Sequence, residues 1–215
     1  MRFDFVKGFA MRSARLLPFL LVAAAVTACT DSGGPDTDDV RPPGALTIIR
    51  LPAASPAIWN PVDSFYAKKG EDRELRINFA NSDTTGPGEE YMRLRVDAGS
   101  LLNYPDGTPI AVGDSVLITV RVQDPALVQF EFQPAGLTFN PSLPAQLKIE
   151  YGETGGDFDD DGDVDAEDSN IEQVMAIWRQ EQPGQSYLKL GGVKIEELNE
   201  IEADILGFTR YAIAY

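Results

Sequence analysis

The sequence predicts an all-β protein, an antiparallel β-sandwich with an acidic loop insertion and at most one short helical turn. Two observations lead to this prediction. Several short runs between residues 73 and 151 alternate apolar with polar side chains, and residues typical of turns separate these runs. Alternation with period two places one face of a strand in a core and the other in solvent. Short strands punctuated by Gly and Pro are typical of a sandwich.

The alternation is clearest in residues 115–123, "SVLITVRVQ", where every second residue is Val or Ile. The same pattern predicts strands over residues 73–79, 91–97, 127–132 and 146–151. The expected core residues are Val116, Ile118, Val120, Leu94, Val96, Phe130, Leu137, Phe139 and Ile149. Turns are expected at Pro87–Gly88, Pro105–Gly107, Asp124–Pro125 and Pro134–Gly136.

The C-terminal part of the chain predicts more strands around one helical segment. A short helical turn is expected near Glu167 to Glu172. Residues 176–190 read as a hairpin that turns at Gln182-Pro183-Gly184. Residues 200–206 and 208–215 then predict two further strands, the first because Ile and Ala alternate with acids.

The N-terminus has the features of a secretory signal peptide over residues 1–28. A positive region is followed by an apolar run from Leu16 to Val26, which is too short to span a bilayer. The signal is complete from Met11, so Met1 and Met11 both remain as possible starts. Its end, "VTAC", resembles the lipobox of bacterial lipoproteins, in which the cysteine is acylated. The alternative is ordinary cleavage after Ala28, which would leave a free thiol.

Cys29 is the only cysteine of the chain, so no disulfide partner competes with lipidation. Residues 29–44 contain too few apolar side chains for a core and predict a flexible acidic tether, leaving residues 45–215 as the folded domain. Thr30 follows the cysteine where an Asp would favour retention at the inner membrane. By resemblance to lipoprotein sorting, this predicts a lipid anchor in the outer membrane of a two-membrane bacterium.

The composition argues against two broad classes of function. The formal net charge is −16, and the predicted signal peptide holds four basic residues against one acidic residue, so the mature chain is more negative still. Such a chain repels nucleic acid, which is therefore not an expected partner. The chain has no histidine, which removes histidine-based triads and the usual zinc sites. We therefore expect a protein that is not an enzyme.

Residues 96–102, "VDAGSLL", and 130–152, "FEFQPAGLTFNPSLPAQLKIEYG", resemble a known module. It is the ZU-five β-sandwich shared by zonula-occludens protein, Unc-five netrin receptors and ankyrins. The matching residues are Pro134, Gly136, Leu137, Phe139 and either Pro141 or Pro144. The resemblance covers residues 89–152, and it implies a structural or protein-interaction role without catalytic residues.

Residues 157–168, "DFDDDGDVDAED", hold eight carboxylates in twelve positions. In a twelve-residue calcium loop, ligands come from positions 1, 3, 5, 7, 9 and 12, and position 6 is Gly. Gly162 occupies position 6, and Val164 at position 8 is expected to pack inward. The predicted ligands of one Ca²⁺ are Asp157, Asp159, Asp161, the carbonyl of Asp163, Asp165 directly or through water, and Asp168.

The loop also departs from the calcium pattern. Asp168 is shorter than the usual Glu, and residues 152–156 leave no room for an entering helix. The loop is also single, whereas dockerin and EF-hand loops are usually paired. A solvated acidic hairpin is the alternative.

Two functions follow as hypotheses. The first is a non-catalytic, lipid-anchored envelope protein that binds or supports an unidentified envelope protein, with calcium as a structural ion. The second is an extracellular protein that binds or hydrolyses glycans, because carboxylate pairs cleave glycosides and aromatic rings stack on sugars. The aromatic candidates for that role are Trp59, Trp178 and Tyr187.

Overall fold

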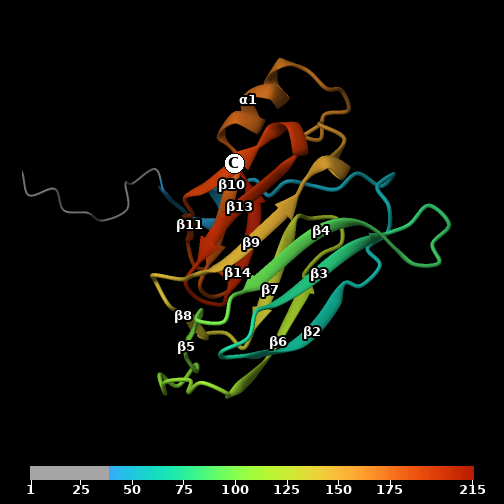
Figure 1. Ribbon diagram of the computed structural model, residues 1–215. Helices are drawn as coiled ribbons and strands as arrows, with labels where there is room; N and C mark the ends of the chain where they lie inside the picture. The colour runs from blue at the N-terminus through green and yellow to red at the C-terminus, as the bar shows by residue number, and fades with distance from the viewer. Residues whose placement is uncertain (1–38) are drawn as a thin grey trace, which may run out of the picture. The chain divides into compact units, whose positions relative to one another are not determined.

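The computed structural model describes residues 39–215. In this part of the chain every paired strand is antiparallel, and the strands form two large sheets and one small pair (Figure 1). The predicted all-β sandwich is thereby confirmed. The predicted signal peptide and Cys29 lie outside the described residues.

The larger sheet has seven strands and the smaller has five. The order of the first is β1 (Val40–Arg41), β11 (Tyr187–Lys189), β10 (Ala176–Gln180), β14 (Arg210–Ala214), β7 (Gln129–Gln133), β6 (Ser115–Val122) and β2 (Val62–Lys68). The order of the second is β12 (Gly192–Ile195), β13 (Glu200–Ile205), β9 (Ala145–Glu150), β4 (Pro87–Val96) and β3 (Arg73–Ala80). The small pair joins β5 (Leu101–Asn103) and β8 (Thr138–Phe139).

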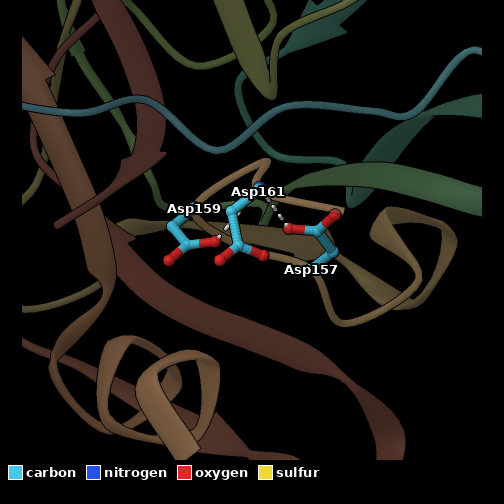
Figure 2. A group of neighbouring side chains, drawn as sticks. All are labelled: Asp157, Asp159 and Asp161. Atoms are coloured by element: carbon cyan, nitrogen blue, oxygen red, sulfur yellow. Dashed lines mark hydrogen bonds between the residues drawn. The ribbon is translucent and has the colours of Figure 1, made fainter. Parts of the chain in front are cut away.

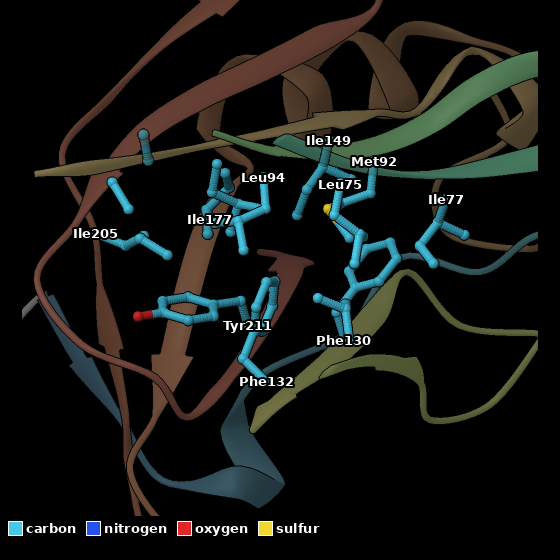
Figure 3. Close-up of a cluster of buried hydrophobic side chains, with 14 of the residues drawn as sticks. Leu75, Ile77, Met92, Leu94, Phe130, Phe132, Ile149, Ile177, Ile205 and Tyr211 are labelled. Carbon is cyan, nitrogen blue, oxygen red and sulfur yellow. The ribbon is translucent and has the colours of Figure 1, made fainter. Parts of the chain in front are cut away.

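The hydrophobic core lies between the two large sheets. Figure 3 shows side chains of the five-stranded sheet, such as Leu94 and Ile149, facing side chains of the seven-stranded sheet, such as Phe130 and Tyr211. The nine predicted core residues are all buried, as alternation with period two requires. Gly136 has the positive φ of +86° that the predicted turn at Pro134–Gly136 needs.

One predicted turn is wrong. Pro87 and Gly88 belong to β4, and the turn between β3 and β4 lies at residues 81–86. Within the same hairpin, Ile77 pairs with Met92 while Asn78 pairs with Glu90, which leaves Tyr91 as an extra residue. This β-bulge allows Tyr91 and Met92, neighbours in sequence, both to be buried.

The last residues of the predicted tether are part of a sheet. Strand β1 lies inside residues 29–44, and its Val40 and Arg41 pair with Leu188 and Tyr187 of β11. A 3₁₀ turn, η2 (Pro43–Ala45), follows. The paired part of the chain therefore begins before residue 45.

The acidic loop forms the crossover between the two sheets. It follows β9 of the five-stranded sheet and a 3₁₀ turn, η3 (Gly152–Thr154), and it leads into α1 (Ala166–Val174), which precedes β10 of the seven-stranded sheet. Figure 1 shows α1 at one end of the sheets and the β5–β8 pair at the other. Helix α1 has nine residues, which is more than the single helical turn predicted.

The predicted hairpin at residues 176–190 is confirmed by the pairing of β10 with β11. A third 3₁₀ turn, η4 (Glu196–Leu198), joins β12 to β13. No helix in residues 39–215 is both long enough and apolar enough to cross a membrane.

Candidate metal centre

The acidic loop folds around the glycine that the calcium pattern requires. Gly162 has a φ of +101°, a conformation that glycine adopts without strain and that makes the sharp turn at the centre of the loop. The prediction for Gly162 is confirmed. Val164, by contrast, is exposed, so the prediction that it packs inward is wrong. Phe158, and not Val164, is the residue of the loop that joins the core.

Phe158 attaches the loop to the sandwich instead. Its buried ring packs against the ring of Tyr151 at the end of β9, with 6.1 Å between ring centroids. Its backbone N–H donates to Oδ1 of Asp168 at 2.6 Å. The start of the loop is therefore tied to the first turn of α1. Phe158 is not among the predicted core residues, although it is the first of only three apolar residues among the twelve of the loop.

Three of the predicted ligands converge. Asp157, Asp159 and Asp161 each offer a carboxylate oxygen, and these oxygens lie within 4.8 Å of one another (Figure 2). Backbone hydrogen bonds hold all three of these side chains, and Asp159 accepts from the N–H of Asp161 at 3.3 Å. Asp157 accepts from the N–H of Asp161 at 3.2 Å and from that of Gly162 at 3.0 Å, and Asp161 accepts from the N–H of Asp163 at 3.1 Å.

The convergence concentrates negative charge. Partial burial raises the pKa of Asp159, and repulsion from Asp161 adds to the effect. Repulsion from Asp161 and then from Asp165 raises the pKa of Asp163. Within residues 39–215, Lys and Arg form no ion pair with the three converging carboxylates. Arg50 does reach the loop, but it pairs with Asp160, at 3.3 Å from Nε to Oδ2.

The other predicted ligands lie at the start of α1. Asp165 is the N-cap residue, and its Oδ1 accepts from the N–H of Glu167 at 2.6 Å. Asp168 is only 3% exposed, and its Oδ2 accepts from the N–H of Asp165 at 2.9 Å. Together they form a capping box, which satisfies backbone donors at the helix start. The structure does not bring these two carboxylates into the converging group. The predicted coordination through the carbonyl of Asp163 stays a prediction.

The arrangement suits a hard divalent cation in part. Calcium takes six to eight oxygen ligands at about 2.3–2.6 Å, from carboxylates, carbonyls and water. Asp157, Asp159 and Asp161 would supply the carboxylates, and a bound cation would relieve their mutual repulsion. Asp168 differs from the usual last ligand, because both of its oxygens already accept backbone hydrogen bonds.

The aromatic residues considered for glycan binding differ in exposure. Trp178 is buried, and its Nε1 donates to the carbonyl of Ala214 at 2.9 Å. Tyr187 is also buried, and its hydroxyl accepts from Nε2 of Gln129 at 3.2 Å. Trp59 is 44% exposed. Of the three, Trp59 alone presents a substantial surface to a ligand.

No protein-family model matches this chain, and no match is found among curated proteins or solved structures.

Proposed function

We propose that the protein is a non-catalytic, lipid-anchored module of the cell envelope that binds or supports another envelope protein and holds one structural Ca²⁺ in its acidic loop. The observation that carries the calcium part is the convergence of the Asp157, Asp159 and Asp161 carboxylates within 4.8 Å. A β-sandwich on a lipid anchor suits a structural or interaction role, and the resemblance to the ZU-five module supports the same role.

Because of the position of the loop, a bound ion would stabilise the connection between the two sheets. The loop and α1 are the connection between β9 in one sheet and β10 in the other. The hydroxyl of Tyr151, next to the end of β9, donates to Oε1 of Glu172 in α1 at 2.9 Å. An ion in the loop would fix this crossover, because it replaces carboxylate repulsion by shared coordination.

Calcium should therefore raise the melting temperature of the full chain. Extracellular sites bind with a Kd of about 10⁻⁴–10⁻³ M, so about 10 mM Ca²⁺ stabilises the native state by about 1.4 kcal/mol at the weak end of this range. For a protein of this size the Tm rises by roughly 3–6 °C, as differential scanning calorimetry would measure. EDTA should reverse the shift.

The double variant Asp157→Ala/Asp161→Ala should lose the calcium shift and keep its fold, because both side chains are on the surface loop. Asp204→Ala is the matched control, since Asp204 is an exposed acid on β13, outside the loop. Calcium should raise the Tm of this control variant as much as it raises that of the wild type. Absence of both a binding heat and a Tm shift in the wild type would end the calcium proposal.

The anchor depends on Cys29, which precedes the described residues. The variant Cys29→Ser should release the protein into the soluble fraction, because several acyl chains at about 0.8 kcal/mol per buried methylene are what hold a lipoprotein on the membrane. Detergent-phase partitioning followed by mass spectrometry of the N-terminal peptide measures both anchoring and acylation. A Cys29→Ser protein that stays on the membrane to the same extent contradicts the anchor.

The partner is best sought in the native envelope. Crosslinking of the full chain in whole cells, followed by mass spectrometry, should recover one envelope protein in the wild type. The Cys29→Ser variant serves as control, since release from the membrane should remove that crosslink.

Trp59 favours glycan binding as a second candidate function. Its exposed ring lines a cavity of about 480 Å³ together with polar side chains, among them Asn60, Asp63 and Glu74. Aromatic rings stack on sugars while neighbouring polar groups bind hydroxyls. A glycan array probed with the wild type and with Trp59→Ala tests this, and a signal that depends on Trp59 would support it over the structural role.

A further inference from the structure

A second, larger cavity of about 550 Å³ lies between the turn end of the β3–β4 hairpin, the segment at residues 54–57 and the turn η3. Its walls are mainly apolar. They include Ala54, Pro56, Ala57, Phe79 and Ala80. A volume of this size is within the range of small-molecule sites, about 300–1,000 Å³.

Hydrogen bonds hold the walls in place. The hydroxyl of Ser55 donates to the carbonyl of Glu153 at 2.7 Å, which fixes the 54–57 segment to η3. The N–H of Ala80 donates to the carbonyl of Ala57 at 2.7 Å, which fixes the same segment to β3. Phe79 is buried, and its ring packs on that of Tyr91 at 4.5 Å between centroids. These contacts fix the 54–57 segment and Phe79, and the turn between β3 and β4 supplies the rest of that wall through Asn81, Ser82 and Thr84.

Two of the polar side chains that line the cavity are carboxylates. Glu89 on β4 and Glu153 on η3 both line the cavity, and within residues 39–215 neither forms an ion pair with Lys or Arg. Desolvation raises the pKa of Glu153, and the charge of Glu89 raises it further. No Lys or Arg of residues 39–215 is among the side chains that line the cavity.

We propose that this cavity binds a small primary alkylammonium ion. The ammonium group would lie between the carboxylates of Glu89 and Glu153, and the alkyl chain would lie against Ala57, Phe79 and Ala80. A metal ion is a poorer fit, because hard cations need six or more oxygens and most of this wall is carbon. An alkylammonium ion suits both the carboxylates and the apolar wall. Its charged group pairs with the carboxylates, and each methylene that it buries against the wall strengthens binding about fourfold.

The probes are hexylammonium, 1-hexanol and hexanoate, which share a chain and differ in the charge of the head group. Each is titrated into the full chain in calcium-free buffer with EDTA, so the result does not depend on the acidic loop. Hexylammonium should bind at least about tenfold more tightly than hexanol, because charge-assisted hydrogen bonds add to the apolar contact. Hexanoate should not bind. Amide shifts in two-dimensional NMR should be centred on Ala57, Ala80 and Gly88.

The variants Glu153→Gln and Glu89→Gln keep side-chain shape and remove charge. Each should weaken hexylammonium about tenfold and leave hexanol unchanged. Glu197→Gln, at an exposed glutamate of η4 outside the cavity, is the matched control and should bind as the wild type does. Equal binding of hexanol and hexylammonium, or wild-type affinity in both glutamine variants, overturns the proposal, as does the absence of hexylammonium binding at tens of millimolar. Unchanged circular dichroism of the variants excludes misfolding as the cause of a loss.

Discussion

Asp168 shows how one side chain can fix the start of a helix and the start of a loop together. Its two oxygens accept from the backbone N–H groups of Asp165, the N-cap residue of α1, and of Phe158, near the start of the acidic loop. These hydrogen bonds, first that of Asp165 and then that of Phe158, lower the pKa of the Asp168 carboxyl below its usual range. The ionised form of Asp168 therefore stabilises the folded state.

The pH dependence of this contribution has a definite sign. Because the folded-state pKa is depressed, the stabilisation is fully present above the pKa of an unfolded aspartate and is lost as pH falls through the folded-state value. Asp168→Asn should melt below the wild type at neutral pH in EDTA, because the amide offers one acceptor oxygen where the carboxylate offers two. The gap in Tm should close as the solution is acidified. Asp204→Asn is the control, and a gap for Asp168→Asn that is constant with pH would contradict this account.

At the scale of elements, a group of charges joins three strands of the five-stranded sheet on its outer face. Nζ of Lys148 on β9 lies 2.8 Å from Oε1 of Glu90 on β4, 2.6 Å from Oε1 of Glu150 and 3.0 Å from Oε2 of Glu200 on β13. Desolvation alone would lower the pKa of Lys148, but the hydrogen bonds to the three carboxylates more than offset it and raise that pKa above its ordinary value.

Removing Lys148 should leave three largely buried carboxylates without their shared cation. The Lys148 side chain is 12% exposed, so we expect Lys148→Ala to cost about 2–3 kcal/mol, somewhat less than the 3–5 kcal/mol of a fully buried pair. Lys68→Ala is the matched control, because Lys68 pairs with Glu71 at an exposed site and should cost about 0–1 kcal/mol. Urea denaturation measures the loss of unfolding free energy in both variants. Equal costs would show that the shared burial of charge is unimportant.

At the scale of the molecule, aromatic rings continue the core from one sheet to the other. Tyr91 of β4 contacts Phe79 of β3 at 4.5 Å and Phe130 of β7 at 5.0 Å between ring centroids. Phe132, also on β7, meets Tyr211 of β14 edge-on at 5.3 Å. Such contacts add to the apolar area that the sheets bury against each other. The sandwich is held chiefly by this shared core.

Two neighbouring residues of β6 test whether the core between the sheets is the main source of stability. Ile118 is fully buried, whereas Leu117 is 48% exposed on the opposite face. Ile118→Ala should cost about 2–5 kcal/mol because it leaves a cavity, and Leu117→Ala should cost less than about 1 kcal/mol. Equilibrium urea unfolding followed by circular dichroism would compare them. Similar costs for the two variants would mean that the core is not where the structure places it.

The sequence by itself determined which face of most strands is buried and where most turns lie. Alternation is a local property, so residues such as Ile118 and Phe130 could be assigned without knowledge of their partners. The same applies to Gly162, because its conformation depends on the local turn.

Only the tertiary structure decided what depends on partners far along the chain. The bulge at Tyr91 is set by how β4 pairs with β3, and the pairing of Val40 with Leu188 joins residues far apart in sequence. In the acidic loop, spacing predicted six ligands, but the capping of α1 takes up Asp165 and Asp168 and leaves three carboxylates together. The cavity with Glu89 and Glu153 has no sequence signal, since its walls come from three separate segments. Local patterns report what each residue prefers, whereas non-local packing decides which groups meet.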